Sequence, residues 1–225
     1  MQVHGTLRTA LWLGLAGCIP VFGQFSPIAT PTSAYTGSTT LIPITAADLT
    51  SLTSLSDGVQ TVTLSAPFVA LTASSIYWGP WGSPPNTESS TPRLVANITP
   101  VTSVTLTLSA PATTFGFELQ PDIRSVFAVS ANFYNGSTLL GTVSQSINGD
   151  AGARLMAASS TTPITSVVIA ISADASGFGI AQFRYIRAIQ PPVVPALSTA
   201  AMGALGLLLA GAGALLSRAR SAIEA

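Results

Sequence analysis

The body of this chain lacks the side chains on which most enzymes depend. His4 and Cys18 are its single histidine and its single cysteine, both near the N-terminus, and the 225 residues contain no lysine. Beyond Gly23 this composition excludes Ser-His-Asp and Cys-His nucleophilic catalysis, Schiff-base chemistry and the common zinc sites. It also excludes a disulfide, so packing and sheet hydrogen bonds alone must stabilise the domain.

Charge is equally scarce. Charged residues make up 7% of the chain, and the formal net charge is +0. Because a nucleic-acid-binding surface requires clustered basic residues, we expect no nucleic acid partner. The chain also has no glycine-rich phosphate loop, and we expect no cofactor.

The N-terminal residues 1–23 have the layout of a secretory signal peptide. A weakly basic start up to Arg8 is followed by a mostly apolar stretch and by small residues before Gln24. This layout predicts a signal helix that is cleaved after Gly23. Leu15-Ala16-Gly17-Cys18 offers an alternative, because it has the form of a lipobox in which Cys18 is lipidated and becomes the first mature residue.

The C-terminal end has the length and composition of a membrane anchor. A proline-rich linker, residues 190–195, precedes an apolar run over residues 196–217, and residues 218–225 form a basic tail. At ~1.5 Å rise per residue, this run spans a ~30 Å hydrocarbon core as one helix. Arg218 and Arg220 are expected on the cytoplasmic side, which leaves everything before the linker outside.

Between the two ends lie roughly 165 residues, enough for one domain with its own core. Residues 24–45, rich in Ser, Thr, Pro and Gly, are expected to form an extended lead-in, and residues 46–189 the domain itself. Apolar residues there alternate with Ser and Thr, which is typical of strands buried on one side. The alternating sets are Val62 and Leu64; Val104, Leu106 and Leu108; Phe115, Phe117 and Leu119; Phe127, Val129, Ala131 and Phe133; Val167, Ile169 and Ile171; and Phe183 and Tyr185. With almost no helical periodicity, the pattern predicts an all-β fold, an antiparallel and jelly-roll-like β-sandwich flanked by the signal helix and the transmembrane helix.

Local signals add detail to this prediction. Asn135-Gly136 lies between two alternating runs and predicts a hairpin with a type I′ turn. Asn148-Gly149-Asp150 predicts a second turn. Asp48 is placed to cap a short helical turn over Leu49–Leu55.

The chain also contains an internal echo. Residues 99–109 align without gaps to residues 162–172, and the register persists through Phe115-Gly116 against Phe178-Gly179. Either the domain contains a duplicated half with two similar hairpins, or strands rich in Thr, Ser and Val resemble one another through composition.

Three segments resemble exported bacterial proteins that carry PEP-CTERM-type sorting tails. Val194-Pro195-Ala196-Leu197-Ser198, followed by the apolar run and the two arginines, resembles the Ile-Pro-Thr-Leu-Ser (IPTL-CTERM) variant of such tails. Residues 114–119 and 176–185 resemble strands of the β-sandwich domains often attached to them. The resemblance implies export, inner-membrane anchoring through the C-terminal helix, and recognition by an exosortase-like processing enzyme. It also implies delivery to the cell surface or the extracellular matrix.

Carboxylates are the remaining candidates for catalysis. The acidic residues of the domain are Asp48, Asp57, Glu88, Glu118, Asp122, Asp150 and Asp174. A glycosidase needs two facing carboxyl groups ~5 to ~9.5 Å apart, and Glu118 and Asp122 are the nearest candidates in sequence. The simpler interpretation is a surface carboxylate beside a turn, paired with Arg124. Asn148 and Asp150 similarly suit either a calcium site or a plain turn.

The segment around residues 77–82 is the best candidate for a binding loop. Tyr77, Trp78 and Trp81 lie close to prolines and are placed to form a flat platform for sugar rings. Alternatively, one or both tryptophans fold back and fill one end of the sandwich.

The sequence therefore favours a non-enzymatic, exported structural or adhesive protein of the cell surface or extracellular matrix, anchored or sorted through its C-terminal helix. The alternative is a carbohydrate-binding module that attaches to extracellular polysaccharide through Trp78 and Trp81. A hydrolase built on carboxylates is a third interpretation.

Overall fold

The computed structural model describes residues 24–74, 78–79, 81–97, 99 and 101–189. The chain divides into two compact units, Met1–Ala188 and Ile189–Ala225. The expected signal peptide, the spanning helix and the sorting residues Val194 to Ser198 lie outside the described residues, as do Arg218 and Arg220. In the described ranges, no helix combines the length and the apolar character needed to cross a membrane.

The described part of the first unit consists mainly of β-strands. They are β1 (Phe25–Ile28), β2 (Thr40–Ile42), β3 (Ser51–Ser56), β4 (Thr61–Thr72), β5 (Arg93–Ala96), β6 (Ser103–Pro121), β7 (Val126–Asn135), β8 (Thr138–Asn148), β9 (Arg154–Ile171) and β10 (Phe178–Arg187), with the helix α1 (Ser33–Ser38) and the 3-10 helix η1 (Ala173–Ala175). The strands pair antiparallel throughout. The prediction of an antiparallel all-β fold is confirmed.

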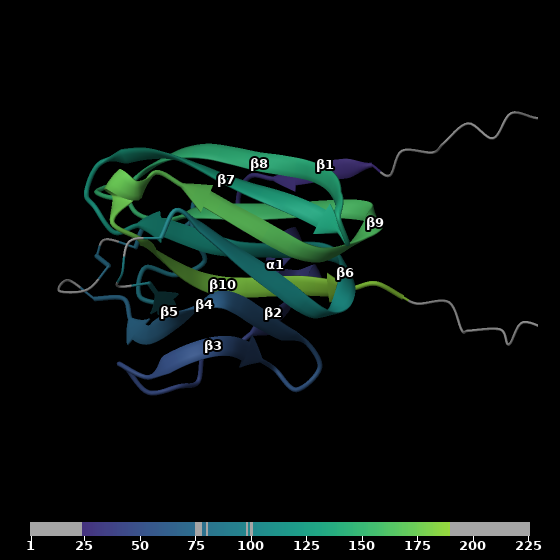
Figure 1. Ribbon diagram of the computed structural model, residues 1–225, viewed down its shortest axis with the longest axis horizontal. Coiled ribbons are helices and arrows are strands. Elements are labelled where there is room, and N and C mark those ends of the chain that lie inside the picture. The colour runs from purple at the N-terminus through teal and green to yellow at the C-terminus, as the bar shows by residue number, and fades with distance from the viewer. Residues whose placement is uncertain (1–23, 75–77, 80, 98, 100, 190–225) are drawn as a thin grey trace, which may run out of the picture. The chain divides into compact units, whose positions relative to one another are not determined.

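The strands form two layers that share three long, bent strands. The first layer contains β3, β7, β8, the first half of β4, the first half of β6 and the second half of β9. The second layer contains β1, β2, β5, β10 and the remaining halves of the three shared strands. Figure 1 shows β7 and β8 beside β9, with β3 beside β4 at the other edge.

A proline lies at the bend of each shared strand. Pro67 separates the part of β4 that pairs with β6 from the part that pairs with β5. Pro111 and Pro163 occupy the same place in β6 and β9, where the ladder shifts register between Thr107 and Thr114. Because proline has no N–H to donate, the ladder is interrupted there and the strand can turn into the other layer.

The main core lies between the layers and contains the side chains that the alternation predicted. Val62 of β4, Leu106 and Phe117 of β6, Phe133 of β7 and Ile169 of β9 are all 0% exposed. Phe127 is the exception among the predicted core residues, since it is only partly buried. Alternation therefore identified the inward face of these strands correctly, because successive side chains of a strand point to opposite faces.

Two local expectations differ from the structure. The extended lead-in contains β1, α1 and β2, and its strands pair with β9 and β10 as parts of the second layer. The short helix expected over Leu49–Leu55 is wrong: β3 begins at Ser51 and pairs with β4. Tertiary pairing overrides the weak capping signal of Asp48 there.

The hairpin between β7 and β8 is confirmed, but its turn lies one residue later than predicted. Asn135 pairs with Thr138, so Gly136 and Ser137 form the two-residue loop. Gly136 has φ 56°, and glycine at the first loop position is the requirement of a type II′ turn.

The internal echo does not reflect two similar hairpins. Its first copy lies on the single strand β6, which continues from Ser103 through Phe117. Its second copy is divided between β9 and β10 by η1. The two copies therefore have different backbone paths and do not form the two similar hairpins expected of a duplicated half-domain.

Candidate functional site

Trp81 cannot take part in the expected platform. Trp81 is 0% exposed and packs in a second apolar cluster with Leu71, Leu94 and Ala153. Trp78 is partly buried against that cluster, and a Cβ at Gly179 would lie 3.1 Å from its ring. Tyr77 lies outside the described residues. A sugar platform that uses Trp81 is therefore wrong, and Trp81 folds back onto the outer side of the second layer.

A buried carboxylate positions the tryptophan segment. Trp81 Nε1 donates to Glu118 Oε2 at 2.8 Å, and the Glu88 backbone N–H donates to Glu118 Oε1 at 2.6 Å. Burial raises the pKa of Glu118 to about 7, although these two hydrogen bonds oppose the rise. Glu118 thus fixes both ends of the loop over residues 81–88 to strand β6.

The same network extends to α1 through an arginine. Arg184 Nε lies 2.7 Å from Glu88 Oε1, and Arg184 Nη1 donates to the carbonyls of Thr36 and Thr39 at 3.1 and 3.2 Å. The hydroxyl of Tyr35 is buried beside this network and has no hydrogen-bond partner among the described residues. Glu118, Glu88 and Arg184 thus hold the loop over residues 81–88 and the helix α1 against the second layer.

Glu118 and Asp122 do not form a facing catalytic pair. Glu118 is 0% exposed beneath Trp81, whereas Asp122 is exposed beyond the end of β6. Arg124 donates to the carbonyl of Gly79 at 3.3 Å, and no ion pair joins it to Asp122 in the described part of the chain.

The predicted turn at residues 148–150 is present. Asn148 Oδ1 accepts a hydrogen bond from the Asp150 N–H at 3.0 Å. In the ranges that the structure describes, no group of three acidic, histidine or cysteine residues is placed to hold a metal ion. The Asn148 side chain therefore serves the turn.

The outer side of the first layer carries a continuous uncharged surface, which we call the hydroxyl face. It consists of the outward residues of five strands, mostly Ser and Thr: Thr61, Thr63 and Ser65 of β4; Ser103, Thr105 and Thr107 of β6; Ser166, Val168 and Ala170 of β9; Ala128, Ser130, Asn132 and Tyr134 of β7; and Thr142, Ser144 and Ser146 of β8. Each of these residues alternates with the core residues of its strand and is exposed or half-buried. None of them is charged.

Strand register arranges these side chains in rows across the sheet. One row runs from Ser103 through Ala170 and Ser130 to Ser144. Since neighbouring strands lie ~4.8 Å apart, successive members of a row are separated by that spacing. The rows therefore present hydroxyl groups at regular intervals, interrupted by the small apolar side chains.

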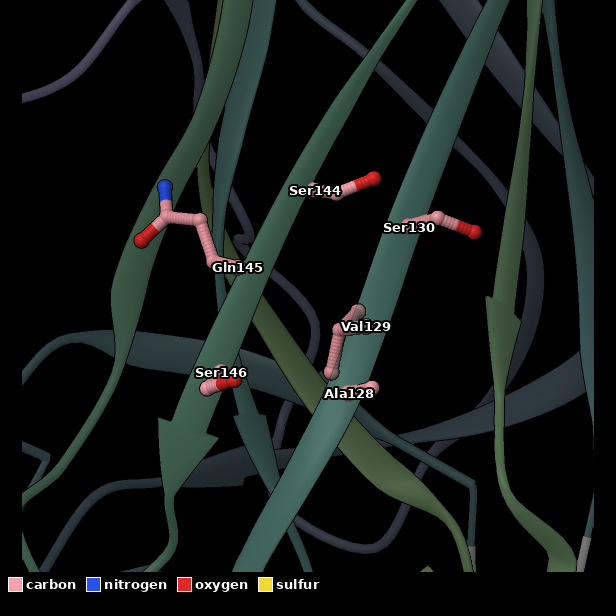
Figure 2. Close-up of a pocket in the computed structure, with 6 residues that line it drawn as sticks. All are labelled: Ala128, Val129, Ser130, Ser144, Gln145 and Ser146. Carbon is pink, nitrogen blue, oxygen red and sulfur yellow. The ribbon is translucent and has the colours of Figure 1, made fainter.

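The hydroxyl face is hollowed between β7 and β8. Ala128, Ser130, Ser144 and Ser146 line this hollow, together with Val129 and Gln145, and its volume is about 260 Å³. Figure 2 shows the Ser130 and Ser144 hydroxyls on the same side of the two strands, with the Gln145 side chain pointing the other way. A ligand placed here would meet hydroxyl groups and no ionic group.

The charged side chains of the described region lie elsewhere. Arg93 and Asp48 pair beside β5, and Glu88 and Arg184 pair over the second layer. Asp57 lies in the β3–β4 turn, where its carboxylate accepts from Tyr185. The sequence carries the signal for the hydroxyl face, because the residues that alternate with the predicted core residues are mostly Ser and Thr.

Comparison with known proteins gives limited similarity. No protein-family model and no curated protein matches this chain. TmCBM61 in complex with beta-1,4-galactotriose is similar with a TM-score of 0.35 and 12% identity, over 58% of this chain and 90% of that chain. The enzymatically active domain of bacteriophage CBA120 tailspike protein 4 has a TM-score of 0.31 and 13% identity, over 58% of this chain and 20% of its own. CsCBM6-3 from Clostridium stercorarium, in complex with cellobiose, has a TM-score of 0.28 and 18% identity, over 54% of this chain and 95% of its own. At such scores the likeness assigns this chain neither a family nor a function.

Proposed function

We propose that this protein is an exported, non-enzymatic module that binds neutral polysaccharide through its hydroxyl face. The observation that supports the proposal most directly is that the outward residues of the five adjacent strands β4, β6, β9, β7 and β8 carry no charge. Solvent-facing sheet surfaces normally carry Lys, Glu and other charged residues, which keep them soluble and block sheet aggregation. A wide neutral face therefore points to a surface with a binding role.

The chemistry of the face suits a sugar polymer. Ser and Thr hydroxyls both donate and accept hydrogen bonds, as the hydroxyl groups of sugars do. The methyl groups of Thr, with Val168 and Ala170, provide small apolar patches for the C–H faces of sugar rings. An anionic polymer would instead require basic side chains, and the face has none.

The proposal includes the location expected from the chain ends. The signal peptide over residues 1–23 exports the domain, and the helix over residues 196–217 holds it at the inner membrane or presents it to an exosortase-like enzyme. Attachment to polysaccharide then gives the protein its adhesive role at the cell surface or in the extracellular matrix.

Adsorption to insoluble glycans tests the proposal. We expect the full-length chain, kept soluble in a detergent without sugar groups, to be retained by insoluble neutral glucan and not by an anionic polymer such as alginate. Retention should not change between low and high salt, because no ionic contact is involved. Retention that falls steeply with salt would contradict the proposal.

A matched pair of charge insertions locates the binding surface. Ser130→Arg places a guanidinium in the middle of the hydroxyl face and should weaken retention about tenfold, equivalent to ~1.4 kcal/mol. Ser90→Arg adds the same charge at an exposed loop position away from this face and should have no effect. Equal retention of the two variants would exclude the hydroxyl face.

A further inference from the structure

The strand β8 forms a long open edge of the first layer. It has 11 residues, and among the described strands it pairs only with β7. Figure 1 shows β8 along the same side of the domain as β1. The unpaired backbone groups of an edge strand are a template for another strand, and most proteins therefore protect long edges.

The usual protection is missing from β8. Its sequence contains no proline and no charged residue, and Gly141 to Asn148 pair with β7 without interruption. The other described edges are shorter: β1 has 4 residues and contains Pro27, and β2 has 3 residues. The edge strand β3 has 6 residues and shifts register after Leu52. Among the described edges, β8 is therefore the one best suited to strand addition.

The outward direction of the Ser144 backbone groups follows from a hydrogen bond further across the sheet. The Ile171 N–H donates to the Thr102 carbonyl at 3.0 Å, so the backbone groups of Ile171 point toward the β6 side of β9. Successive residues of an antiparallel strand direct these groups to opposite sides. Ala170 therefore points toward β7, and its partner Ser130 points toward β9. Ser144 lies opposite Ser130, so its N–H and C=O point away from β7 and out of the sheet.

The same alternation directs the backbone groups of Thr142 and Ser146 outward. In the part of the chain that the structure describes, the backbone N–H and C=O of Thr142, Ser144 and Ser146 have no hydrogen-bond partner. All three residues are exposed. The edge thus offers a donor and an acceptor at three evenly spaced residues, with Ser144 in the centre.

We propose that β8 pairs with the β8 of a second copy of this chain, antiparallel about a two-fold axis beside Ser144. In this register Ser144 lies opposite the same residue of the second copy, and Thr142 lies opposite Ser146. Every outward N–H and C=O of one copy then meets its complement on the other. A shift by one residue would place outward side chains opposite inward ones. A shift by two residues would leave one of the three residues outside the matched set.

An identical partner suits this edge because its side chains carry no charge. Like charges directly opposite each other destabilise a strand pair, and β8 has none to bring together. A hollow of about 340 Å³ also lies beside the edge, lined by residues 142–145 of β8 and by Pro27, Ile28 and Ala29. The inward side chains of the added strand, Val143 and Gln145 of the second copy, would lie next to this hollow.

The dimer goes beyond the proposed function and requires no glycan. Because the two-fold axis is perpendicular to the sheet, the hydroxyl faces of both copies lie on the same side and form one continuous surface. A single strand pair is a small interface, and interfaces below about 1,200 Å² are typically weak or transient. We therefore expect a dimer whose population depends on protein concentration.

Sedimentation velocity of the full-length chain, in detergent and without any glycan, tests the dimer. Over a series of protein concentrations, we expect the complex to change from one protein to two. Ser144→Pro removes an N–H that the ladder with β7 does not use, and proline is tolerated at such edge positions. This variant should weaken dimerisation at least about tenfold, equivalent to ~1.4 kcal/mol. Ser144→Ala keeps the N–H and is the matched control, which should dimerise like the parent chain.

A second variant is available should Ser144→Pro not fold. Ser144→Lys places two ammonium groups opposite each other across the axis and should also weaken the dimer. The inference is overturned if the parent chain contains one protein per complex at every concentration, or three or more. It is equally overturned if association persists unchanged in the folded edge variant, because another part of the chain, such as the expected spanning helix, would then be responsible.

A disulfide locates the axis. In a Cys18→Ala background, Ser144→Cys places two thiols across the axis, where the Cα atoms of a hydrogen-bonded pair lie ~5.5 Å apart, a separation that a disulfide can bridge. Ser130→Cys in the same background is the matched control, since three strand spacings separate this position from its copy by ~14 Å. Mild oxidation should link the Ser144→Cys chain into dimers and leave the Ser130→Cys chain unlinked. Equal linking of the two chains, or linking of neither, contradicts the proposed register.

Discussion

Trp81 and Glu118, 37 positions apart in the sequence, form a fully buried hydrogen bond of 2.8 Å between indole Nε1 and carboxylate Oε2. This hydrogen bond holds the Trp81 indole against the outer side of the second layer, where it is shielded from solvent. It also explains why a carboxylate is tolerated there, since the Glu88 N–H satisfies the other oxygen at 2.6 Å.

Removal of the indole donor should destabilise the domain. Trp81→Phe leaves Glu118 Oε2 buried without its partner, and we expect a loss of ~1.5–3 kcal/mol in the free energy of unfolding, as for hydrogen bonds to charged groups. Urea denaturation measures this loss. Trp78→Phe is the matched control, because Trp78 is only partly buried and should cost less. Equal destabilisation of the two variants would show that packing, and not the hydrogen bond, is decisive.

The stability of the domain should depend on the protonation of Glu118. Its pKa rises from 4.5 to about 7 on folding, chiefly through burial. Between these two pH values the folded state binds more protons than the unfolded state, so the free energy of unfolding decreases as the pH rises. This contribution is fully present below about pH 4.5 and lost above about pH 7, and its size is about 3 kcal/mol.

Urea midpoints measured at intervals between about pH 4 and about pH 8 test this dependence. In Glu118→Gln the titrating group is absent, so the midpoint should be nearly constant over the same interval. A midpoint that falls equally in the parent chain and in Glu118→Gln would assign the effect to another group.

The sequence predicted the core of the fold well because its information is local. Val104, Leu106 and Leu108 alternate with Ser and Thr over a few residues, and period-two alternation specifies which face of a strand is buried. The signal for the hairpin at Gly136 is also local, because it depends on the turn residues and the two strands that flank them. Each of these features depends on residues that are close together in the chain.

Local alternation could not predict how the loop over residues 81–88 packs on the outer side of the second layer. Whether Trp81 faces solvent or the sheet depends on Glu118, a partner far away in sequence, and aromatic residues near prolines suit both outcomes. The pairing of β1 with β9 likewise joins residues that are distant in the chain, such as Ser26 and Ser159. Such contacts depend on tertiary register, which local periodicity does not specify.

Arg184 should control the stability of α1. Its guanidinium joins Glu88 to the carbonyls of Thr36 and Thr39, and the ammonium of a lysine cannot reproduce this planar fork. Arg184→Lys should therefore accelerate amide hydrogen exchange over Ser33–Ser38 about tenfold or more, equivalent to ~1.4 kcal/mol. Arg187→Lys, at an exposed end of β10, is the control. Unchanged exchange in Arg184→Lys would mean that packing of Tyr35 alone holds the helix.

Two glycines near α1 differ in the space around them: Gly116 is closely packed, whereas Gly37 faces open space. A Cβ at Gly116 would lie 2.3 Å from the Ala157 Cβ and 2.6 Å from the Tyr35 hydroxyl, whereas a Cβ at Gly37 meets nothing within 4 Å. Gly116→Ala should thus destabilise the domain by ~1–3 kcal/mol through overpacking. Gly37→Ala, inside the helix, should stabilise it by ~0.4–1 kcal/mol, because alanine restricts the unfolded chain. Thermal unfolding of both variants measures the difference, and the same sign of change in the two would refute the close contact between α1 and the second layer.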